Sequence, residues 1–445
     1  MINSNRLSFY VLALYFMITS MIYYTNPFVK VISQSKEEVD VKKLQEEFFY
    51  FVQITDTHIS AHKKNNFDEF FNFINKIDPD FLINTGDVTD GVNSHGEFYS
   101  TKEDFDVYFS SLKKLKCKSY VVLGNHDTFG HHSSLENYFA NDFNQSFEYN
   151  GCLFVLLDGT LKDRPKGILN FFGIFEDDNF LKKLPMKMYK KIFLCTHYPT
   201  TTLISKYTIT ADVILCGHLH TYWSMIHRKH SNGVVELVGK NYKNGRFRIF
   251  TVDNGIISFN DFDFNDKPKV VIISPTDKLL KNKIKDKKFI KILQFFSDKI
   301  VIYADGKSIF EMKINKRDLQ SNKIIKIPMP SECKVIKVVG YNEFGSTFHE
   351  IFLEKDRFNI TTIHIPFKYI PFFFLVLYLI LIYRLRETKS ISGTLIRMTM
   401  RILLPNAYVK LYTEKYVFLF SFGTYLQSNF ESFMFFMSTS FIYES

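Results

Sequence analysis

Two side chains that can bind a metal ion follow the apolar run "FFYFVQI". Asp56 and His58 are separated by one residue and lie just past the apolar part of this run. Such a run is typical of a buried strand, and residues two apart on a strand point the same way. We therefore expect a carboxylate and an imidazole to converge at the carboxyl end of a strand. Burying an unpaired carboxylate is costly, so either a metal ion compensates its charge or the strand end faces water.

Four further apolar runs end in side chains of the same kind: Asp87 after "FLIN", Asn125 and His126 after "SYVVL", His197 after "KIFL", and His218 and His220 after "DVIL". In open α/β sheets, ligands bind at the carboxyl ends of the strands. One block such as "GNHD" is more often a turn than a site. Five blocks, all at strand ends, are hard to explain by structure alone, and they predict one shared site.

The residue types indicate which ion this site would bind. Carboxylate, carboxamide and neutral imidazole ligands suit Mn, Fe or Zn rather than Ca. Two divalent ions would keep about one positive charge after Asp56, Asp87 and a bridging hydroxide are counted, and that charge attracts a phosphate dianion. Coordination lowers the pKa of water, and a pair of ions can clamp both oxygens of an in-line displacement. The expected reaction is hydrolysis of a phosphate ester by in-line attack of a metal-bound hydroxide.

Taken together, the blocks "DTH", "GDVTD", "GNHD", "TH" and "GHLH" resemble the calcineurin-like metallophosphoesterase superfamily over roughly Phe51 to Phe264. The resemblance implies two divalent metal ions of unknown identity. It implies ligand roles for Asp56, His58, Asp87 and His220 at the first ion, and for Asp87, Asn125, His197 and His218 at the second, with Asp87 bridging. It also implies that His126 protonates the leaving group and that Asp90 orients His126.

The residues at Asp90 and Gly91 differ from those of two phosphatase subclasses of this superfamily. Purple acid phosphatases carry a Tyr where Asp90 stands, so an iron–tyrosinate centre is not expected. Protein serine/threonine phosphatases follow the second Asp with an Arg, whereas Gly91 follows Asp90 here. Blocks such as "NFFGIFE" and "KPKVVIISP" are similar to the transmembrane protein 62 family. That similarity implies an N-terminal hydrophobic segment, an immunoglobulin-like domain and several membrane helices. The family carries further spans where this sequence ends at Ser445, so a reduced or truncated bundle is expected.

The spacing of apolar runs predicts the folded domains. Within residues 45–265, short apolar strands alternate with helical patterns, which is typical of an α/β domain with sheets covered on both faces. The superfamily resemblance implies a β-sandwich flanked by helices in four αββα layers. Within residues 267–362, strands are separated by turns such as "ADG" without a helical pattern, which predicts a small immunoglobulin-like β-sandwich. The alternative is that these strands extend the first domain.

Three apolar stretches predict attachment to a membrane. Residues 1–30 contain the uncharged run Leu7 to Tyr24, which approaches the length of a bilayer span and lacks a small-residue cleavage site, so a signal anchor is expected. Residues 368–445 form an expected C-terminal membrane region. Its first core, Tyr369 to Tyr383, could instead be a buried core helix. Its second stretch, Val417 to Tyr443, could be a membrane helix, a re-entrant segment or part of a bundle.

Basic residues after the second apolar stretch predict the orientation. Arg384, Arg386 and Lys389 follow Tyr383, and the positive-inside rule places that side in the cytosol. Two spans then put the intervening domains, with the active site, in the lumen of an endomembrane or outside the cell. The lipid bilayer is therefore an expected partner of the chain.

The distribution of charge argues against a nucleic-acid enzyme. The net charge is +10, from 56 basic and 46 acidic residues among 445. Residues 1–265, which carry the metal-binding blocks, hold 28 basic and 30 acidic side chains, whereas residues 266–445 hold 28 and 16. A nucleic-acid enzyme usually places a basic stripe beside its site, so no nucleic acid partner is expected.

The five cysteines show no paired metal spacing, and their odd number excludes a fully paired disulfide scaffold.

The loop that contains Arg164 and Lys166 could contact the substrate, and a function other than catalysis is possible for the metal site. Arg164 and Lys166 could hold a substrate phosphate because Arg suits bidentate contacts to phosphate, although a loop cation is usually solvated. The alternative to an enzyme is a non-catalytic membrane adaptor that uses the metal site to bind a phosphorylated ligand or partner. The presence of all seven ligand-type residues together with His126 favours the enzyme, because a decayed site should have lost some of them.

Overall fold

The computed structural model describes residues 29–33, 48–62, 66–91, 101–129, 143–160, 173–185, 188–205, 207–220, 227–230, 232–280, 288–314, 323–330, 333–354, 416–418 and 442–444. The expected membrane stretches Leu7–Tyr24 and Tyr369–Tyr383 lie outside these residues, as do Arg164 and Lys166. Among the helices that are described, none has both the length and the apolar character needed to cross a membrane. At the ends of the third expected stretch, β23 (Tyr416–Phe418) pairs antiparallel with β24 (Ile442–Glu444).

Five strands form the first sheet, in the order β15-β14-β2-β3-β4. Their bounds are β2 (Phe48–Ile54), β3 (Phe81–Asn84), β4 (Lys118–Val121), β14 (Arg246–Asp253) and β15 (Ile256–Asp263). The strands β2, β3 and β4 run parallel, so their carboxyl ends lie along one edge of the sheet. The strand β14 runs antiparallel to both β2 and β15.

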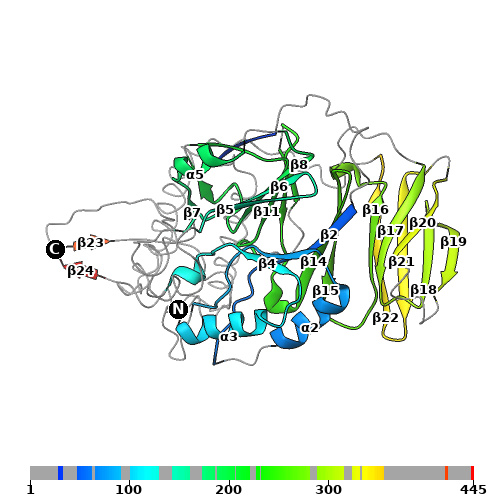
Figure 1. Cartoon of the computed structure of the whole chain (residues 1–445), viewed down its shortest axis with the longest axis horizontal. Helices are drawn as coiled ribbons and strands as arrows, with labels where there is room; N and C mark the ends of the chain where they lie inside the picture. Colours follow the sequence, from blue (N-terminus) through cyan, green and yellow to red (C-terminus); the bar gives the residue numbers. More distant parts are fainter. Residues whose placement is uncertain are drawn as a thin grey trace, which may run out of the picture.

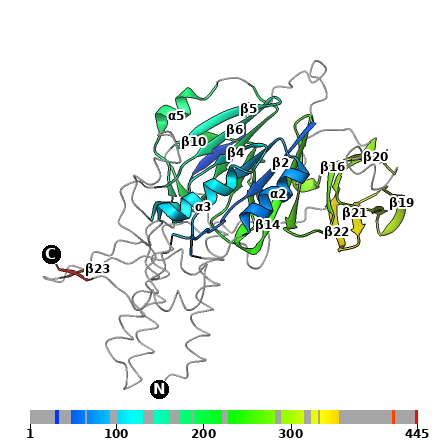
Figure 2. The same ribbon diagram turned by 60° about the horizontal axis from the view of Figure 1, so that its bottom comes forward.

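Two helices, α2 (Phe67–Ile77) and α3 (Lys102–Leu112), cover the outer face of this sheet (Figure 2). The buried residues of α2 recur at helical spacing and pack against the apolar side chains of β2 and β14. The helix α3 begins with a capping box, because the Thr101 hydroxyl accepts from the Asp104 amide while the Asp104 carboxylate accepts from the Thr101 amide.

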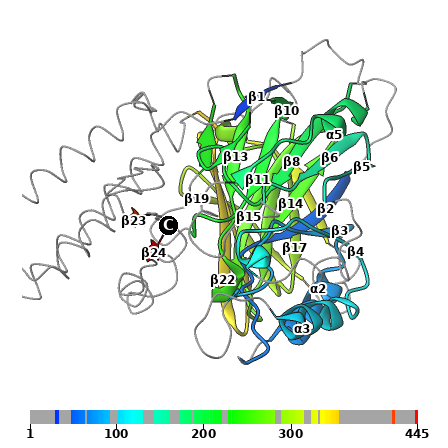
Figure 3. The ribbon, with the colours of Figure 1, turned by 90° about the vertical axis from the view of Figure 1, so that its left-hand side faces the viewer.

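Six strands form the second sheet, in the order β12-β13-β11-β8-β6-β5. Figure 3 shows the part of this sheet from β13 to β5. Their bounds are β5 (Gln145–Tyr149), β6 (Cys152–Leu157), β8 (Lys191–Thr196), β11 (Val213–Cys216), β12 (His227–Lys229) and β13 (Val235–Val238). The four central strands run parallel. Short elements pack against the outer face of this sheet or connect its strands. They are α5 (Asp178–Lys183), β1 (Lys30–Ile32) paired with β10 (Thr208–Thr210), and β7 (Gly173–Ile174) paired with β9 (Leu203–Ile204).

The two sheets pack face to face around aromatic side chains. Phe51 of β2 stacks on Phe81 and on Phe250 with ring centroids 4.9 Å away in each case. It meets Phe154 and Phe193 of the second sheet edge-on at 5.5 and 5.8 Å. Because both faces of each sheet are covered, the central strands read as continuous apolar runs, and the expected α/β class is confirmed. In the described residues, the outer layer of the second sheet contains one short helix and two strand pairs rather than a full helical layer.

Seven strands follow β15 and form two antiparallel sheets at one end of the molecule (Figure 1). One sheet has the order β16-β17-β20 and the other β19-β18-β21-β22. Their bounds are β16 (Lys269–Ser274), β17 (Phe289–Phe295), β18 (Lys299–Ala304), β19 (Lys307–Lys313), β20 (Ile324–Pro328), β21 (Val335–Asn342) and β22 (Gly345–Phe352). The two sheets enclose one cluster of buried Ile and Val side chains.

These seven strands also share a hydrophobic core with the helix layer of the first sheet. Val271, Leu293 and Phe295 belong to the same buried cluster as side chains of α2 and β2. The Phe295 ring lies 5.7 Å from the Tyr50 ring, centroid to centroid. The Lys291 ammonium is 2.6 Å from the Asp253 carboxylate. The β16–β22 unit is therefore joined to the rest by apolar burial as well as by a polar contact.

We expect Phe295→Ala to destabilise the whole chain, because it removes apolar area from this shared core. Phe295 is 4% exposed, and truncating such a buried ring to Ala typically costs about 3–5 kcal/mol. Phe344→Ala is the matched control, because that ring is 57% exposed. Denaturant unfolding should show one transition displaced to lower denaturant for Phe295→Ala and almost no change for the control. Equal, small effects of both changes would mean that the β16–β22 unit does not depend on this contact.

The buried Lys269 predicts a rise of stability with pH. Its ammonium donates to the main-chain oxygen of Asn265 and lies 5.4 Å from the centre of the Phe73 ring, and burial lowers its pKa from 10.5 to about 8. Between these values the unfolded chain binds the proton more tightly, so the free energy of unfolding rises with pH. The free energy of unfolding of the chain, relative to that of its Lys269→Met variant, should therefore rise by up to roughly 3 kcal/mol from pH 8 to 10.5. A difference independent of pH over this range would show that Lys269 titrates normally.

Candidate metal centre

The carboxyl ends of the two sheets meet, and the expected side chains gather there. The loops after β2, β3 and β4 come from the first sheet, and the loops after β8 and β11 from the second. Main-chain hydrogen bonds join the first two loops, from the Asp56 amide to the Gly86 oxygen and from the His58 amide to the Asp87 oxygen. All nine candidate residues that belong to these loops are buried: Asp56, His58, Asp87, Asp90, Asn125, His126, His197, His218 and His220.

The backbone is strained at four of these residues. Asp56, His58, Asp87 and His218 have positive φ angles between 47° and 68°, a region that favours glycine. Each such residue costs about 1–3 kcal/mol and persists only where the surroundings enforce it. A glycine would relieve the strain but would remove the side chain. The retention of Asp and His at these positions indicates that the side chains are needed there.

Close packing explains why glycine occupies neighbouring positions instead. A Cβ atom on Gly217 would lie 1.9 Å from the Thr55 hydroxyl oxygen. A Cβ atom on Gly86, whose φ is +98°, would lie 2.6 Å from Nδ1 of His197. Side chains at these two positions would push the loops apart, so the glycines allow the two sheets to approach at the site.

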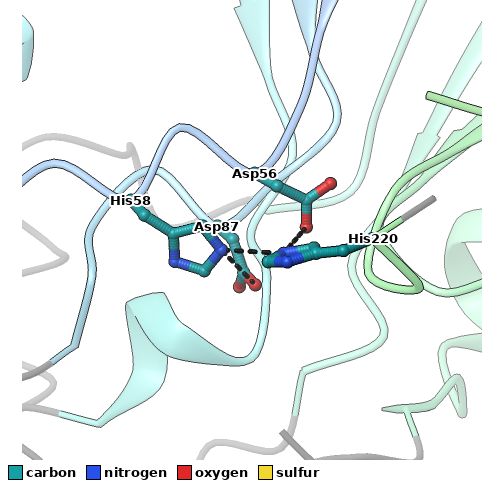
Figure 4. A group of neighbouring side chains, drawn as sticks. All are labelled: Asp56, His58, Asp87 and His220. Atoms are coloured by element: carbon teal, nitrogen blue, oxygen red, sulfur yellow. Dashed lines mark hydrogen bonds and ion pairs between the residues drawn. The ribbon is translucent and has the colours of Figure 1, made fainter. Parts of the chain in front are cut away.

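A first group of four side chains converges in Figure 4, which shows Asp56, His58, Asp87 and His220. One potential ligand atom from each lies within 4.8 Å of the others. Nε2 of His58 is 3.0 Å from Nε2 of His220 and 3.8 Å from Oδ2 of Asp87. Oδ1 of Asp56 is 3.2 Å from Nε2 of His220. These are the four residues expected at the first ion.

A second group converges on the other side of Asp87. Oδ1 of Asn125 is 3.0 Å from Nε2 of His197 and 2.8 Å from Nδ1 of His218. Oδ2 of Asp87 is 3.3 Å from the same His197 nitrogen. The four residues expected at the second ion are therefore together, and Asp87 belongs to both groups.

The hydrogen bonding of these atoms fits divalent cations. Oδ1 of Asp87 accepts from the His126 amide, but Oδ2 accepts no hydrogen bond within the described part of the chain although it is fully buried. Oδ2 of Asp56 is likewise without a hydrogen bond in the described residues. His197 can donate from Nδ1 to the Thr85 oxygen at 2.9 Å, which leaves the Nε2 lone pair facing Asp87 and Asn125. Acceptors that meet in this way repel one another unless a cation lies between them.

Burial and the neighbouring charges shift the pKa values of three of these residues, two in the direction that a metal ligand requires and one against it. Burial, reinforced by the neighbouring His126, lowers the pKa of His58 well below its usual value, so His58 is neutral at pH 7. Burial raises the pKa of Asp87, but the charges of His197 and His126 outweigh it and hold that pKa well below its usual value. Burial alone would lower the pKa of His197, yet Asp87 raises it to about 9. A cation bound at His197 would therefore displace a proton.

The contact between Asp90 and His126 differs from the expectation in one respect. Nδ1 of His126 is 2.6 Å from the main-chain oxygen of Asp90, not from its carboxylate. The Asp90 carboxylate is instead 3.5 Å from Nδ1 of His58 and 3.7 Å from the ammonium of Lys243. The sequence could not distinguish these arrangements because both atoms belong to the same residue. The other nitrogen of His126, Nε2, is 3.9 Å from Oδ2 of Asp87.

Sequence reasoning missed one buried carboxylate in this region. Asp127 accepts from the amides of Gly124 and Thr89 at 2.9 Å each, and so ties the loops after β3 and β4 together. Burial, with a contribution from the charge of Asp87, raises its pKa to about 7. The signal was the last letter of "GNHD", where an acidic residue follows two functional residues.

Comparisons with known proteins agree with this geometry. Residues 49–222 match the calcineurin-like phosphoesterase family, which uses two divalent metal ions. Transmembrane protein 62 of Mus musculus is 30% identical over 265 residues, covering 51% of this chain and 41% of that protein. A protein of Arabidopsis thaliana described as a metallophosphoesterase is 24% identical over 332 residues, covering 55% and 44%.

A third relative is shorter. A protein of Arcobacter nitrofigilis described as a glycerophosphodiester phosphodiesterase is 26% identical over 222 residues, covering 39% of this chain and 74% of that protein. The chain spans less than half the length of the first two relatives. The family match confirms the resemblance that the five sequence blocks indicate.

The shared position of Asp87 predicts the effect of removing its charge. Asp87→Asn should release at least one of two bound ions, because it weakens a ligand of both groups and leaves the repulsion between the cations less screened. The loss of affinity should exceed the roughly 10–100-fold that loss of an outer partner costs. Asp90→Asn is the control for the loss of an outer partner, because the Asp90 carboxylate lies 3.5 Å from Nδ1 of His58 but belongs to neither group of four expected ligands. Metal analysis after dialysis that finds two ions retained in Asp87→Asn would contradict the bridging assignment.

Proposed function

Because the chain carries a calcineurin-like phosphoesterase domain, we propose that it is a membrane-anchored phosphoesterase that uses two divalent metal ions to hydrolyse phosphate esters. The observation that carries this proposal is the position of His126. It belongs to neither group of four expected ligands, yet it is buried beside Asp87 and its Nδ1 is held by the Asp90 oxygen. A protein that only binds a phosphorylated partner has no need of an oriented imidazole at this point.

The chain's own residues provide the binding part of the reaction. Asp56, His58, Asp87 and His220 would hold one ion, and Asn125, His197 and His218 would complete the second group with Asp87. The ions, when bound, would supply Lewis-acid activation of water and of the phosphoryl group. The buried loops exclude bulk water from this position, which strengthens the electrostatic interactions there.

His126 has the geometry of a general acid. Its Nδ1–H can donate to the main-chain oxygen of Asp90, so this hydrogen bond does not depend on the Asp90 carboxylate. The Nε2 edge then faces the centre beside Asp87 and can hold the proton that a leaving oxygen needs. The carboxylate of Asp90 lies next to His58 and Lys243, where it balances the charge of the Lys243 ammonium.

Two features support a choice of substrates and of location. One relative is described as a glycerophosphodiester phosphodiesterase, so esters with an alkoxide leaving group are the first substrates to test. The uncharged run Leu7–Tyr24 and the name of the mouse relative, Transmembrane protein 62, support membrane anchoring. The basic residues Arg384, Arg386 and Lys389 after the second apolar stretch support an extracytosolic site. The two antiparallel sheets around one apolar core support an immunoglobulin-like domain for residues 267–362.

We expect His126→Ala to keep both metal ions and to lose activity selectively. An oriented general acid contributes on the order of 10²–10⁴-fold, most of it when the leaving oxygen is basic. The loss should therefore be large for alkyl phosphate esters and much smaller for nitrophenyl esters, whose leaving group departs without a proton. The measurement is the slope of log rate against leaving-group pKa for the chain and for His126→Ala.

Two further variants separate proton donation by His126 from metal binding and from orientation by Asp90. Asn125→Ala should weaken metal binding and slow both substrate classes alike, because it removes a ligand rather than a proton donor. Asp90→Asn should keep the steepness of the wild-type slope, because the main-chain oxygen that orients His126 remains. Equal slopes for the chain and His126→Ala would contradict the general-acid role. A chain that binds two ions but hydrolyses no ester of either class would favour the adaptor function.

A further inference from the structure

A row of polar side chains crosses the first sheet immediately beneath the metal centre. Gln53, Arg248 and Asp261 are direct cross-strand neighbours on β2, β14 and β15. Arg248 is among the largest fully buried side chains of the described residues, and its Nε and Nη2 atoms donate to the two Asp261 oxygens at 2.7 and 3.2 Å. Its guanidinium also lies 4.7 Å from the centre of the Phe259 ring. The far end of the row is therefore rigidly held.

Gln53 connects this row to the loops of the site. Its side-chain oxygen accepts from Nη1 of Arg248 at 3.3 Å. Its side-chain nitrogen donates to the Thr85 hydroxyl at 3.2 Å and to the Cys216 main-chain oxygen at 3.4 Å. Arg248 makes a second contact with the other sheet, because its Nη2 donates to the Val238 main-chain oxygen at 3.1 Å. Two hydrogen bonds thus join the first sheet to the carboxyl ends of β11 and β13 in the second.

Both residues to which the Gln53 side chain donates, Thr85 and Cys216, lead directly to expected metal ligands. The main-chain oxygen of Thr85 accepts from Nδ1 of His197, which fixes the orientation of that ring. Cys216 ends β11, and His218 follows two residues later. The amide of His218 in turn donates to Oδ1 of Asp56 at 3.0 Å. A movement of Gln53 would therefore displace ligands that come from opposite sheets.

The position of Gln53 is unusual for a residue that only fills the core. It is 1% exposed and follows Phe49 and Phe51 on the inner face of β2, where the rest of the layer is apolar. Replacing buried ionic or polar groups by apolar residues of similar volume is often neutral or stabilising. A polar layer at this level is therefore more simply explained by the geometry that it imposes than by the stability that it contributes.

We propose that Gln53, anchored by Arg248 and Asp261, is a positioning residue that holds the two sheets at the separation which both groups of metal ligands require. The two groups should depend on it unequally. The first group takes three ligands from the first sheet and only His220 from the second. The second group takes Asp87 and Asn125 from the first sheet and His197 and His218 from the second. Loosening the contact between the sheets should therefore weaken the second group more.

Cobalt(II) binding to the full-length chain tests this inference. Cobalt reports on its ligands through visible absorbance, so each equivalent can be followed without substrate and without turnover. We expect the wild-type chain to take up two equivalents. Gln53→Met removes all three hydrogen bonds of the Gln53 side chain at nearly constant volume. It should bind the first equivalent nearly normally and the second about 10–100-fold more weakly, the usual effect of losing a partner behind a ligand.

Two variants separate positioning from general stability. Gln294→Met is the matched control, because Gln294 is equally buried but lies on β17, in the β16–β22 unit. It should bind both cobalt ions as the wild type does, whatever its melting temperature. Gln53→Glu keeps the acceptor for Arg248 but cannot donate to the Cys216 oxygen. It should melt closer to the wild type than Gln53→Met does in the metal-free state, and still bind the second cobalt ion weakly.

The outcomes are distinct. A weakened second equivalent in both Gln53 variants, with normal binding in Gln294→Met, supports the positioning role. If Gln53→Met does not fold, the comparison of Gln53→Glu with Gln294→Met decides alone. Wild-type affinity for both ions in a folded Gln53 variant, or an equal loss in Gln294→Met, would overturn it. Because binding is measured without substrate, a wild-type chain that hydrolyses no ester would remove the proposed function, while the cobalt comparison would still decide on Gln53.

Discussion

The mutual repulsion of buried acceptor atoms is the constraint on which the rest of this structure depends. Carboxylate, carboxamide and imidazole acceptors from five loops meet at Asp87, where Oδ2 lies within 3.3 to 3.9 Å of three histidine nitrogens. Burial removes the water that would otherwise screen these groups. Such an arrangement is stable only when positive charge lies among the acceptors, either as protons or as cations. The raised pKa of His197 shows the first solution, and two divalent ions would provide the second.

Packing between the two sheets offsets the backbone strain and the electrostatic repulsion at the site. Positive φ angles at Asp56, His58, Asp87 and His218 and the close approach at Gly217 all require that the two sheets meet tightly at their carboxyl ends. The aromatic layer around Phe51 provides that contact at one level, and the hydrogen bonds of Gln53 and Arg248 provide it at the next. Apolar burial thus brings the sheets together, and polar contacts set how the loops are aligned.

Much of the site could be predicted from the sequence, because ligands that act together must lie at the ends of adjacent strands. The side chain types at Asp56, Asp87, Asn125 and His218, each following an apolar run, carried that information. The atom of Asp90 that holds His126 could not be predicted, since the choice between carbonyl and carboxylate depends on the backbone path. The role of Gln53 was equally hidden, because its partners Thr85, Cys216 and Arg248 are distant in sequence and become neighbours only when both sheets are formed. The shared core of Phe295 and Tyr50 was missed for the same reason.

We propose that the acceptors around Asp87 hold two divalent cations, with His126 adjacent to them but bound to neither. Anomalous diffraction from crystals of the chain grown with manganese, recorded near the manganese absorption edge, tests it most directly. We expect two anomalous peaks about 3.5–4 Å apart, one on each side of the Asp87 carboxylate, and none at a ligand distance from His126. A single peak, two peaks that do not share Asp87, or a peak coordinated by His126 would contradict the account.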